Sequence, residues 1–337
     1  EDINVSLKTL KSNKTLSIVD VLNIGKILKL SSELKSYFFS DDLIDLNDFN
    51  TIYSYFDNLY INKNIENKIF SAIIDKFTID DKASSTLYNI RSAKRKIDQE
   101  IKNKLNNYIS SSSYSKYLQD PVVTIKNDRY VIPVKEEYKN NIKGFIHDMS
   151  NSGSTVFIEP ISVFDLNSTI STLTVEENIE IEKILTNFTS MLFEILDELE
   201  NDLRLIGLLD FIFAKANYSI VLNATKPLLN ENKEINLIKA RHPLIDSSTV
   251  VPININLGIN FNTLVITGPN TGGKTVTLKT TGLIVLMAMS GLNIPASENS
   301  SVFVFDNIFA DIGDEQSIQE SLSTFSSHML NIIEILN

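Results

Sequence analysis

The chain has 337 residues, 43% of them apolar and 22% charged, a balance typical of a soluble globular protein of about two domains. It contains no cysteine and three well-separated histidines, which excludes disulfide scaffolds and thiol catalysis and disfavours a histidine-rich metal site. The net charge of −11 argues against a generally basic nucleic-acid-binding surface but leaves room for a local basic stripe. Neither a signal peptide nor a membrane-spanning segment is evident, so we expect a cytoplasmic location. The missing initiator methionine suggests a piece of a longer protein.

The first 120 residues are predicted to form long helices, because they contain no proline and one glycine, Gly25. Within residues 81–110 the apolar side chains recur every three or four positions, which predicts one long amphipathic helix. These positions are Leu87, Ile90, Ile97, Ile101, Leu105 and Ile109. The opposite face carries Arg91, Lys94, Arg95, Lys96, Lys102 and Lys104. This basic face is either a solvated surface or a stripe that follows nucleic-acid phosphates, and the pattern leaves both interpretations open.

Residues 121–160 are predicted to form a small β module. The predicted strands occupy residues 122–125, 130–132, 144–147 and 155–158. The polar segments 126–129 and 150–154 between them carry turn residues, which indicates two hairpins. Helical spacing of apolar residues returns over 162–224. A β module between two helical stretches is typical of the tip of an extended arm.

The strongest chemical signal is the segment from Gly268 to Thr275, which matches G-x-x-x-x-G-K-[ST]. Its residues are Gly268, Pro269, Asn270, Thr271, Gly272, Gly273, Lys274 and Thr275. The glycines let backbone N–H groups surround phosphate oxygens, and the following helix directs its positive end at them. Lys274 can reach the β- and γ-phosphates of ATP, and the Thr275 hydroxyl can ligate Mg²⁺. The apolar run 264–266 before the loop is predicted to be a buried parallel strand, and the helix after the loop is predicted to end at Gly291.

Hydrolysis of ATP requires an acid that holds Mg²⁺ and a residue that orients the attacking water. The apolar run 302–305 ends in Asp306, but Asn307 follows where an activating glutamate would stand. We therefore expect the hydrolytic half of the site to be missing and the chain by itself to turn over little ATP.

A cluster of serines and a threonine precedes an apolar helical face over 325–336. Ser323 and Thr324 are either simple helix caps or groups aimed at the γ-phosphate of ATP, which they could reach across a dimer interface. Acidic residues just upstream are interpreted as favouring the helix dipole rather than as a metal site.

The segments 268–281 (GPNTGGKTVTLKTT) and 311–329 (DIGDEQSIQESLSTFSSHM) together resemble the MutS superfamily. Three further segments are similar to its second bacterial branch: 129–135 (RYVIPVK), 144–160 (GFIHDMSNSGSTVFIEP) and 240–244 (ARHPL). The resemblance covers essentially the whole chain and is specific from about residue 118 onward.

The resemblance implies a multidomain chain, with a mainly α-helical core and lever, a small β module, and the first half of an α/β P-loop ATPase domain of the ABC type. On that pattern the core and lever, the clamp-like β module, the returning helices and the truncated ATPase domain occupy residues 1–120, 121–160, 161–230 and 231–337. The mismatch-reading N-terminal domain of classical MutS, the Asp-Glu strand of the ATPase domain and the C-terminal Smr nuclease domain are not visible in the sequence.

The resemblance also implies a homodimeric clamp that uses ATP and Mg²⁺, with Ser323 and Thr324 completing the partner's site. Members of this branch are described as DNA-binding ATPases that suppress homologous recombination and as factors that split collided ribosomes. DNA, or the ribosome and its rRNA, are therefore the expected partners, and no membrane is expected. Candidate nucleic-acid contacts are Arg91, Arg95, Lys102, Arg129, Lys135, Lys139 and Lys143. Val250 or Val251 is expected to pack against the adenine, because the aromatic residue of classical members is missing here.

Two alternatives stay open from the sequence: a classical mismatch-repair MutS ATPase, and a structural module that binds nucleotide without hydrolysing it. His147 and Asp148 lack the nucleophile-elbow context of a hydrolase, so we assign them no catalytic role.

Overall fold

The computed structural model of the chain describes residues 3–40, 50–269, 272–310, 329 and 333. The chain divides into two compact units, Glu1–Gly207 and Leu208–Asn337, and each is described by itself. Their boundary lies within helix α8 (Leu196–Val221), upstream of residue 231, where the sequence pattern places the start of the ATPase domain. None of the helices in the described ranges combines the length and the apolar character that crossing a bilayer requires.

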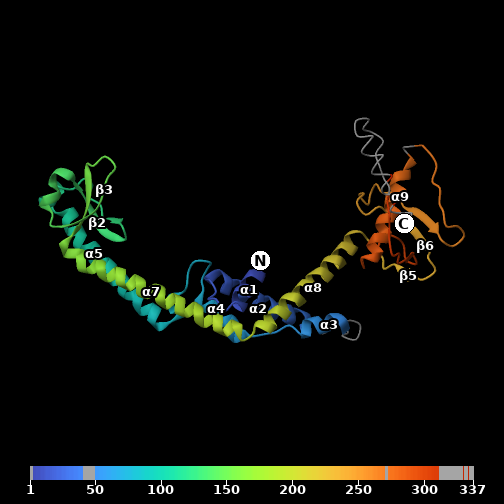
Figure 1. Cartoon of the computed structure of the whole chain (residues 1–337), viewed down its shortest axis with the longest axis horizontal. Coiled ribbons are helices and arrows are strands. Elements are labelled where there is room, and N and C mark those ends of the chain that lie inside the picture. The colour runs from blue at the N-terminus through green and yellow to red at the C-terminus, as the bar shows by residue number, and fades with distance from the viewer. Residues whose placement is uncertain (1–2, 41–49, 270–271, 311–328, 330–332, 334–337) are drawn as a thin grey trace. The chain divides into compact units, whose positions relative to one another are not determined.

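The first unit is built mainly from helices (Figure 1). They are α1 (Asn4–Lys11), α2 (Ile18–Phe39), α3 (Asn50–Asp57), α4 (Lys63–Ala72), α5 (Ser85–Ser110), α6 (Ser112–Ser115), α7 (Ile161–Phe193) and the start of α8, with the 3-10 turns η2 (Asp81–Ala83) and η3 (Glu136–Asn141). Side-chain caps start several of them: Ser17 forms a capping box with Asp20 at α2, and Ser84 accepts a hydrogen bond from the first turn of α5. The prediction of long helices in this third of the chain is confirmed by α2, with 22 residues, and α5, with 26.

The core of the first unit lies where α1, α2 and α4 pack against the end of α7 and the start of α8. Fully buried members include Leu10, Ile24, Leu28, Ile69, Leu192 and Leu199. These side chains come from the periodic apolar faces of their helices, so burial of apolar surface is the main stabilising term here.

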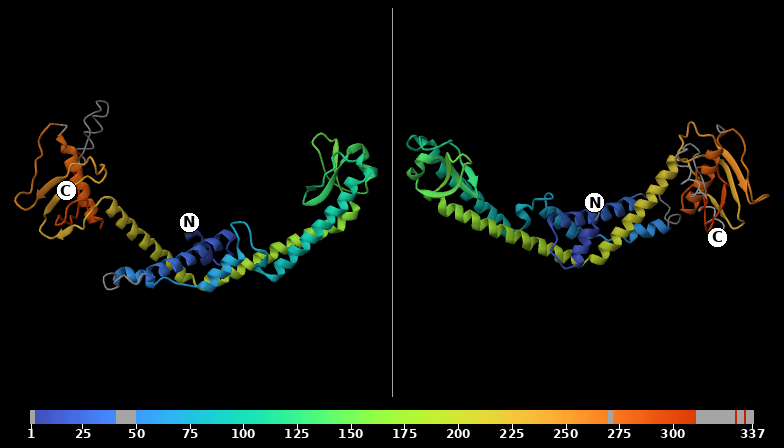
Figure 2. Two further views of the ribbon diagram at one scale, coloured as in Figure 1. Left: turned by 180° about the vertical axis from the view of Figure 1, so that it is seen from behind. Right: turned by 45° about the horizontal axis from the view of Figure 1, so that its top comes forward.

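Helices α5 and α7 leave this core side by side and run antiparallel, as both views of Figure 2 show. Contacts at both ends fix this pairing: Ser84 Oγ donates to Glu180 Oε1 at 2.7 Å near the core, and the hydroxyls of Tyr108 and Ser162 lie 3.2 Å apart near the tip. The predicted apolar stripe of α5 is confirmed at Leu87, Ile101 and Leu105, which are fully buried.

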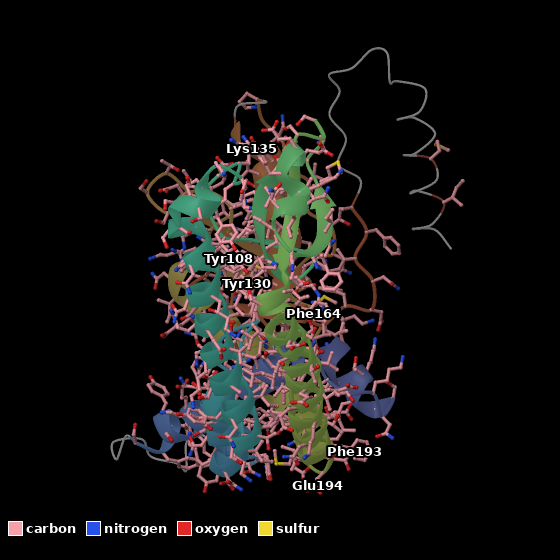
Figure 3. The ribbon with its side chains drawn as sticks, turned by 90° about the vertical axis from the view of Figure 1, so that its left-hand side faces the viewer. Tyr108, Tyr130, Lys135, Phe164, Phe193 and Glu194 are labelled. Atoms are coloured by element: carbon pink, nitrogen blue, oxygen red, sulfur yellow. The ribbon has the colours of Figure 1, made fainter. Side chains whose placement is uncertain are left out.

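The β module lies at the far end of this helix pair. Its strands are β1 (Thr124–Lys126), β2 (Arg129–Lys135), β3 (Gly144–Met149) and β4 (Thr155–Pro160), in the antiparallel order β1-β2-β4-β3. Both predicted hairpins are present, although the first turn is tighter than expected and consists of Asn127 and Asp128, with φ of 50° and 59°. Two successive positive φ angles are typical of a type I′ hairpin turn. Figure 3 shows Lys135 at the outer end of the module and Phe193 and Glu194 at the opposite end of α7.

The described residues of the second unit form a small mixed sheet and a long helix besides the end of α8. The elements are β5 (Leu228–Asn230), β6 (Ile235–Ala240), β7 (Ile253–Leu257), α9 (Lys274–Met289) and β8 (Ser301–Phe303). The sheet order is β5-β8-β6-β7, in which β5 and β8 are parallel and the other pairs antiparallel. Its core joins the sheet residues Leu237 and Val302 to Ile284 of α9. Gly291, with φ of +70°, follows the end of α9, as the sequence predicts.

Candidate nucleotide site and nucleic-acid surface

The described residues of the phosphate-loop motif lead directly into α9. Gly272 N–H donates to the Pro269 carbonyl at 2.9 Å, which closes the described part of the loop. Gly273 has φ of +77° and is the N-cap of α9, and Gly268 has φ of +147°. Side-chain-bearing L-residues rarely adopt such angles, so the glycines are required by the backbone path. Asn270 and Thr271 lie outside the described residues.

The first turn of α9 supplies groups suited to an anion. The helix makes its first backbone bond from Thr277 N–H to the Gly273 carbonyl at 2.8 Å. The amides of Thr275 and Val276 precede this bond, so no intrahelical carbonyl accepts from them. Together with the positive end of the helix dipole, they form an arrangement that favours phosphate.

Lys274 and Thr275 are the first two residues of α9. The Lys274 ammonium folds back over the loop and donates to the Gly268 carbonyl. A phosphate at the loop could replace that carbonyl as the acceptor of the Lys274 hydrogen bond. Thr275, in the first turn of α9, is exposed, so its hydroxyl is accessible to a Mg²⁺ ion bound with a nucleotide. The residues present therefore fit a bound nucleoside triphosphate.

The two valines proposed to pack on adenine are in different environments. Val250 lines a cavity of about 470 Å³, together with Arg241, His242 and Pro295, whereas Val251 is 77% exposed and lies outside that lining. The Arg241 guanidinium donates to the carbonyls of Leu222 and Asn223 just beyond the end of α8, at 3.1 and 2.6 Å. Arg241 therefore has a helix-capping role that the sequence did not reveal.

The predicted buried strand at 264–266 is wrong. These residues form no strand, and Leu264, Val265 and Ile266 are 43%, 77% and 37% exposed. A strand before a phosphate loop is stabilised by neighbours that pair with its backbone. In the part of the chain that the structure describes, β5 to β8 form their own sheet and do not pair with this segment.

The strand predicted to carry an acid for Mg²⁺ is only partly formed among the described residues. The predicted strand before Asp306 is present only as β8, which stops at Phe303, and Asp306 itself is exposed. The described ranges contain no cluster of histidine, aspartate and glutamate side chains that could hold a metal ion. Ser323 and Thr324 lie outside the described residues.

The basic face of α5 is largely paired with carboxylates. Arg91 donates to Asp81 at 2.8 Å and to Glu177 at 2.7 Å, while Lys94 contacts Glu177 at 2.6 Å. Arg95 contacts Asp81 at 2.7 Å. Towards the tip, Lys102 pairs with Asp98 and Lys104 with Glu100 within the helix.

These pairs shift the ionisation of their members. Burial opposes the charged form of Arg91, but hydrogen bonds with Asp81 and Glu177 outweigh it and raise the pKa of Arg91. Hydrogen bonds from Arg91 and Arg95 lower the pKa of Asp81. Burial would raise the pKa of Glu177, but its hydrogen bonds with Lys94 and Arg91 lower it overall. The geometry thus gives Arg91 a structural role, joining α5 to α7.

The β-module cations fall into two groups. Arg129 donates to Glu159 at 2.8 Å, and its guanidinium lies 5.3 Å from the centre of the Phe164 ring. Lys139 pairs with Glu136 at 2.5 Å. Among the described residues, the Lys135 ammonium contacts only a backbone carbonyl, at 3.4 Å, and the exposed Lys143 side chain forms no ion pair. Lys135 and Lys143 therefore keep their charges available to phosphate.

Sequence reasoning missed the polar network at the base of the module. Glu159 is fully buried and accepts hydrogen bonds from Arg129, from Asn167 at 2.6 Å and from the His147 ring at 2.5 Å. Asn167 also pairs with the backbone N–H and carbonyl of Tyr130, each at 3.1 Å. The network joins three strands to α7 and gives His147 a structural role.

The chain thus combines a phosphate-loop motif with a helical pair, α5 and α7, that ends in a β module. A family profile described as MutS domain V matches residues 264–337. The chain is similar to proteins named endonuclease MutS2 from Acetivibrio thermocellus, Clostridioides difficile and Caldanaerobacter subterraneus, at 49%, 46% and 48% identity over 99%, 99% and 100% of its length. It therefore belongs to the MutS family, in the branch of these relatives. The chain spans 42% of the length of each.

Proposed function

We propose that the chain binds ATP with Mg²⁺ at its phosphate loop and that the whole protein is a MutS-type clamp that closes when this nucleotide is bound. The observation that carries the proposal is the left-handed Gly273 at the start of α9, with the Lys274 ammonium folded back onto the Gly268 carbonyl. Such an arrangement directs backbone amides, a helix dipole and an ammonium at one point, which suits a triphosphate better than a neutral ligand.

Each group has a distinct task in this proposal. The amides at the start of α9 bind the phosphate oxygens, and Lys274 moves its hydrogen bond from the Gly268 carbonyl to the β- and γ-phosphates. Thr275 orients the metal, and the metal supplies neutralisation of phosphate charge when it is bound. Val250 supplies aliphatic packing near the base.

The second half of the site comes, in this proposal, from a second copy of the protein. Ser323 and Thr324 contact the γ-phosphate bound by the partner, so that ATP stabilises the closed dimer relative to the open one. ATP hydrolysis also needs a carboxylate that activates the attacking water. In this proposal that carboxylate comes from a part of the whole protein that the 337 residues do not include.

The expected macromolecular partner is a nucleic acid, free as DNA or within the ribosome. The half-buried Lys135 and the exposed Lys143, neither of which is paired with a carboxylate among the described residues, are the best-supported contacts on the β module. Suppression of homologous recombination and splitting of collided ribosomes are the two biological roles we propose to test first. The relatives' name, endonuclease, adds nucleic-acid cleavage by the whole protein to the proposal.

A mixing experiment on the whole protein tests the shared site. The variant Lys274→Ala loses ATP binding in its own loop, and the double variant Ser323→Ala, Thr324→Val loses the groups offered to the partner. Each alone should show little ATP turnover. After subunit exchange in an equal mixture, about half of the dimers contain one subunit of each variant, and each of these has one complete site out of two. The mixture should therefore recover about a quarter of wild-type turnover. A mixture as inactive as its components would contradict the shared site.

A further inference from the structure

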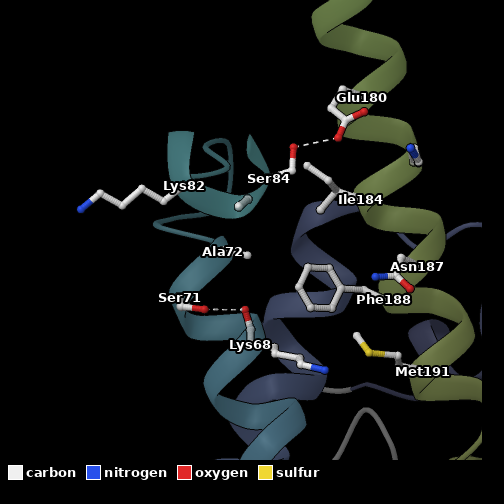
Figure 4. Close-up of a pocket in the computed structure, with 12 residues that line it drawn as sticks. Lys68, Ser71, Ala72, Lys82, Ser84, Glu180, Ile184, Asn187, Phe188 and Met191 are labelled. Carbon is white, nitrogen blue, oxygen red and sulfur yellow. Dashed lines mark hydrogen bonds between the residues drawn. The ribbon is translucent and has the colours of Figure 1, made fainter. Parts of the chain in front are cut away.

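A second cavity, of about 540 Å³, lies in the first unit between α4, η2 and α7. It is lined by Lys68, Ser71, Ala72, Lys82, Ala83, Ser84, Glu180, Lys183, Ile184, Asn187, Phe188 and Met191. Figure 4 shows α4 on one side and α7 on the other, with Phe188 pointing from α7 into the space between them. A volume of this size accommodates a small organic ligand.

The floor of the cavity is apolar. Ala72 and Phe188 are 6% and 5% exposed and belong to the core of the unit, while Ile184 and Met191 pack against that core and remain partly exposed. Ile184, Phe188 and Met191 follow one another at helical spacing, so α7 presents one apolar stripe to the cavity. The partly exposed Ile184 and Met191 offer apolar surface, and a ligand that covers it gains free energy from its burial.

The rim of the cavity offers hydrogen-bond donors. Lys68, Lys82 and Lys183 come from three different elements, and within the described ranges none of them has an ion-pair partner. Figure 4 shows Lys68 reaching from α4 toward α7, whereas the Lys82 side chain extends outward. Asn187 is exposed and adds an amide. Three cations around one cavity repel one another, and an anion between them removes that repulsion.

The acceptors at the cavity are already engaged. Glu180, 9% exposed, accepts from Ser84 Oγ at 2.7 Å, and Ser84 Oγ in turn accepts from Leu87 N–H at 3.0 Å. Ser71 donates to the Lys68 carbonyl at 3.0 Å. The groups left to bind a ligand are therefore mostly donors, which selects an acceptor-rich, negatively charged head.

We propose that this cavity is a binding site for a small organic phosphate with an apolar or planar body. The phosphate would lie between Lys68 and Lys183, with Lys82 able to swing in, and the body would cover Ile184 and Met191. A phosphate monoester is favoured over a carboxylate because its charge at neutral pH, about −1.5 to −2, better matches three lysines. Because the ligand would bridge α4 and α7, binding would tie the core to the helix that continues to the β module.

Calorimetry with AMP, on the whole protein carrying Lys274→Ala, tests the site without interference from the phosphate loop. AMP should bind saturably, and adenosine and inorganic phosphate, which each offer one part of the ligand, should bind more weakly. The variant Lys68→Glu, Lys183→Glu should weaken AMP binding at least about tenfold. The matched control Lys8→Glu, Lys96→Glu reverses two exposed lysines outside the cavity and should leave it unchanged.

A second variant separates the cavity from general charge effects. Asn187→Trp adds an indole at an exposed position of the lining and should block AMP while the far-ultraviolet circular dichroism stays unchanged. The proposal is overturned if AMP shows no saturable heat, or if it binds equally well to the Lys68→Glu, Lys183→Glu variant and its control. A poly-glutamate peptide that binds more tightly than AMP would assign the cavity to an acidic protein segment instead.

Discussion

The ion pairs between α5 and α7 lead to a quantitative prediction for Arg91→Ala. Arg91 donates to Glu177, to Asp81 and to the Ile79 carbonyl, at 2.7, 2.8 and 2.6 Å. The Arg91 and Glu177 side chains are 19% and 15% exposed, between the fully exposed and the fully buried case. Exposed pairs contribute about 0–1 kcal/mol, and breaking buried pairs costs about 3–5 kcal/mol. We therefore expect Arg91→Ala to lower the free energy of unfolding by about 2–3 kcal/mol.

Urea unfolding followed by circular dichroism measures this loss, with Lys104→Ala as the control. Lys104 contacts Glu100 at 3.0 Å, but the two side chains are 42% and 52% exposed, so its removal should cost under about 0.5 kcal/mol. A loss for Arg91→Ala no larger than that of the control would refute the structural role of Arg91.

The same pair predicts a pH dependence. The pKa values of Glu177 and Asp81 are lowered in the folded protein. Their stabilisation is therefore complete above the unfolded-state pKa values, near 4, and is lost as the pH falls through the lower folded-state values. The difference in stability between wild type and Arg91→Ala should shrink on acidification from pH 7 to about pH 3. A constant difference over that range would contradict the assignment.

Three further predictions concern other parts of the chain. Glu159→Gln should lower the stability to thermal unfolding by about 2–4 kcal/mol, because it leaves Arg129 without its buried counter-charge; an unchanged transition would count against the network. Asp202 is fully buried, its pKa is raised by burial, and it accepts hydrogen bonds from the Ser31 hydroxyl and the Tyr60 amide. Asp202→Ala should therefore lower the free energy of urea unfolding by about 2 kcal/mol, and Asp202→Asn by less than about 1 kcal/mol. Equal losses for the two variants would argue against this reasoning. Lys135→Glu with Lys143→Glu should weaken nucleic-acid binding and reduce its logarithmic salt slope by about two, which titrations at several salt concentrations measure; an unchanged slope would remove both lysines from the interface.

Local patterns predicted the elements of the fold well. The spacing of Leu87, Ile101 and Leu105 identifies the buried face of α5, because an amphipathic helix buries the one side on which its apolar residues recur. The polar residues at 126–129 indicate the first hairpin. The sequence did not indicate that Asn127 and Asp128 adopt left-handed backbone angles, which make its turn two residues long. The glycine at 273 fixes the start of α9, because the motif places a left-handed residue there.

Contacts between distant residues could not be predicted in this way. The basic face of α5 looks the same in sequence whether it is solvated, bound to phosphate or paired with Glu177, which lies 86 positions beyond Arg91. The run 264–266 has the composition of a buried strand, but pairing and burial depend on neighbouring strands, and in the described residues it has none. His147 and Glu159 become a recognisable pair only once β3 and β4 lie side by side.

Titration calorimetry of the whole protein with Mg-ATP tests the central claim most directly. Wild type and the control Lys279→Ala, an exposed lysine on α9 beyond the loop, should bind with the same affinity. Lys274→Ala should bind at least about a hundredfold more weakly, since the charged hydrogen bonds to the β- and γ-phosphates are lost. Equal heats for Lys274→Ala and wild type, or no heat with any of the three proteins, would contradict the account.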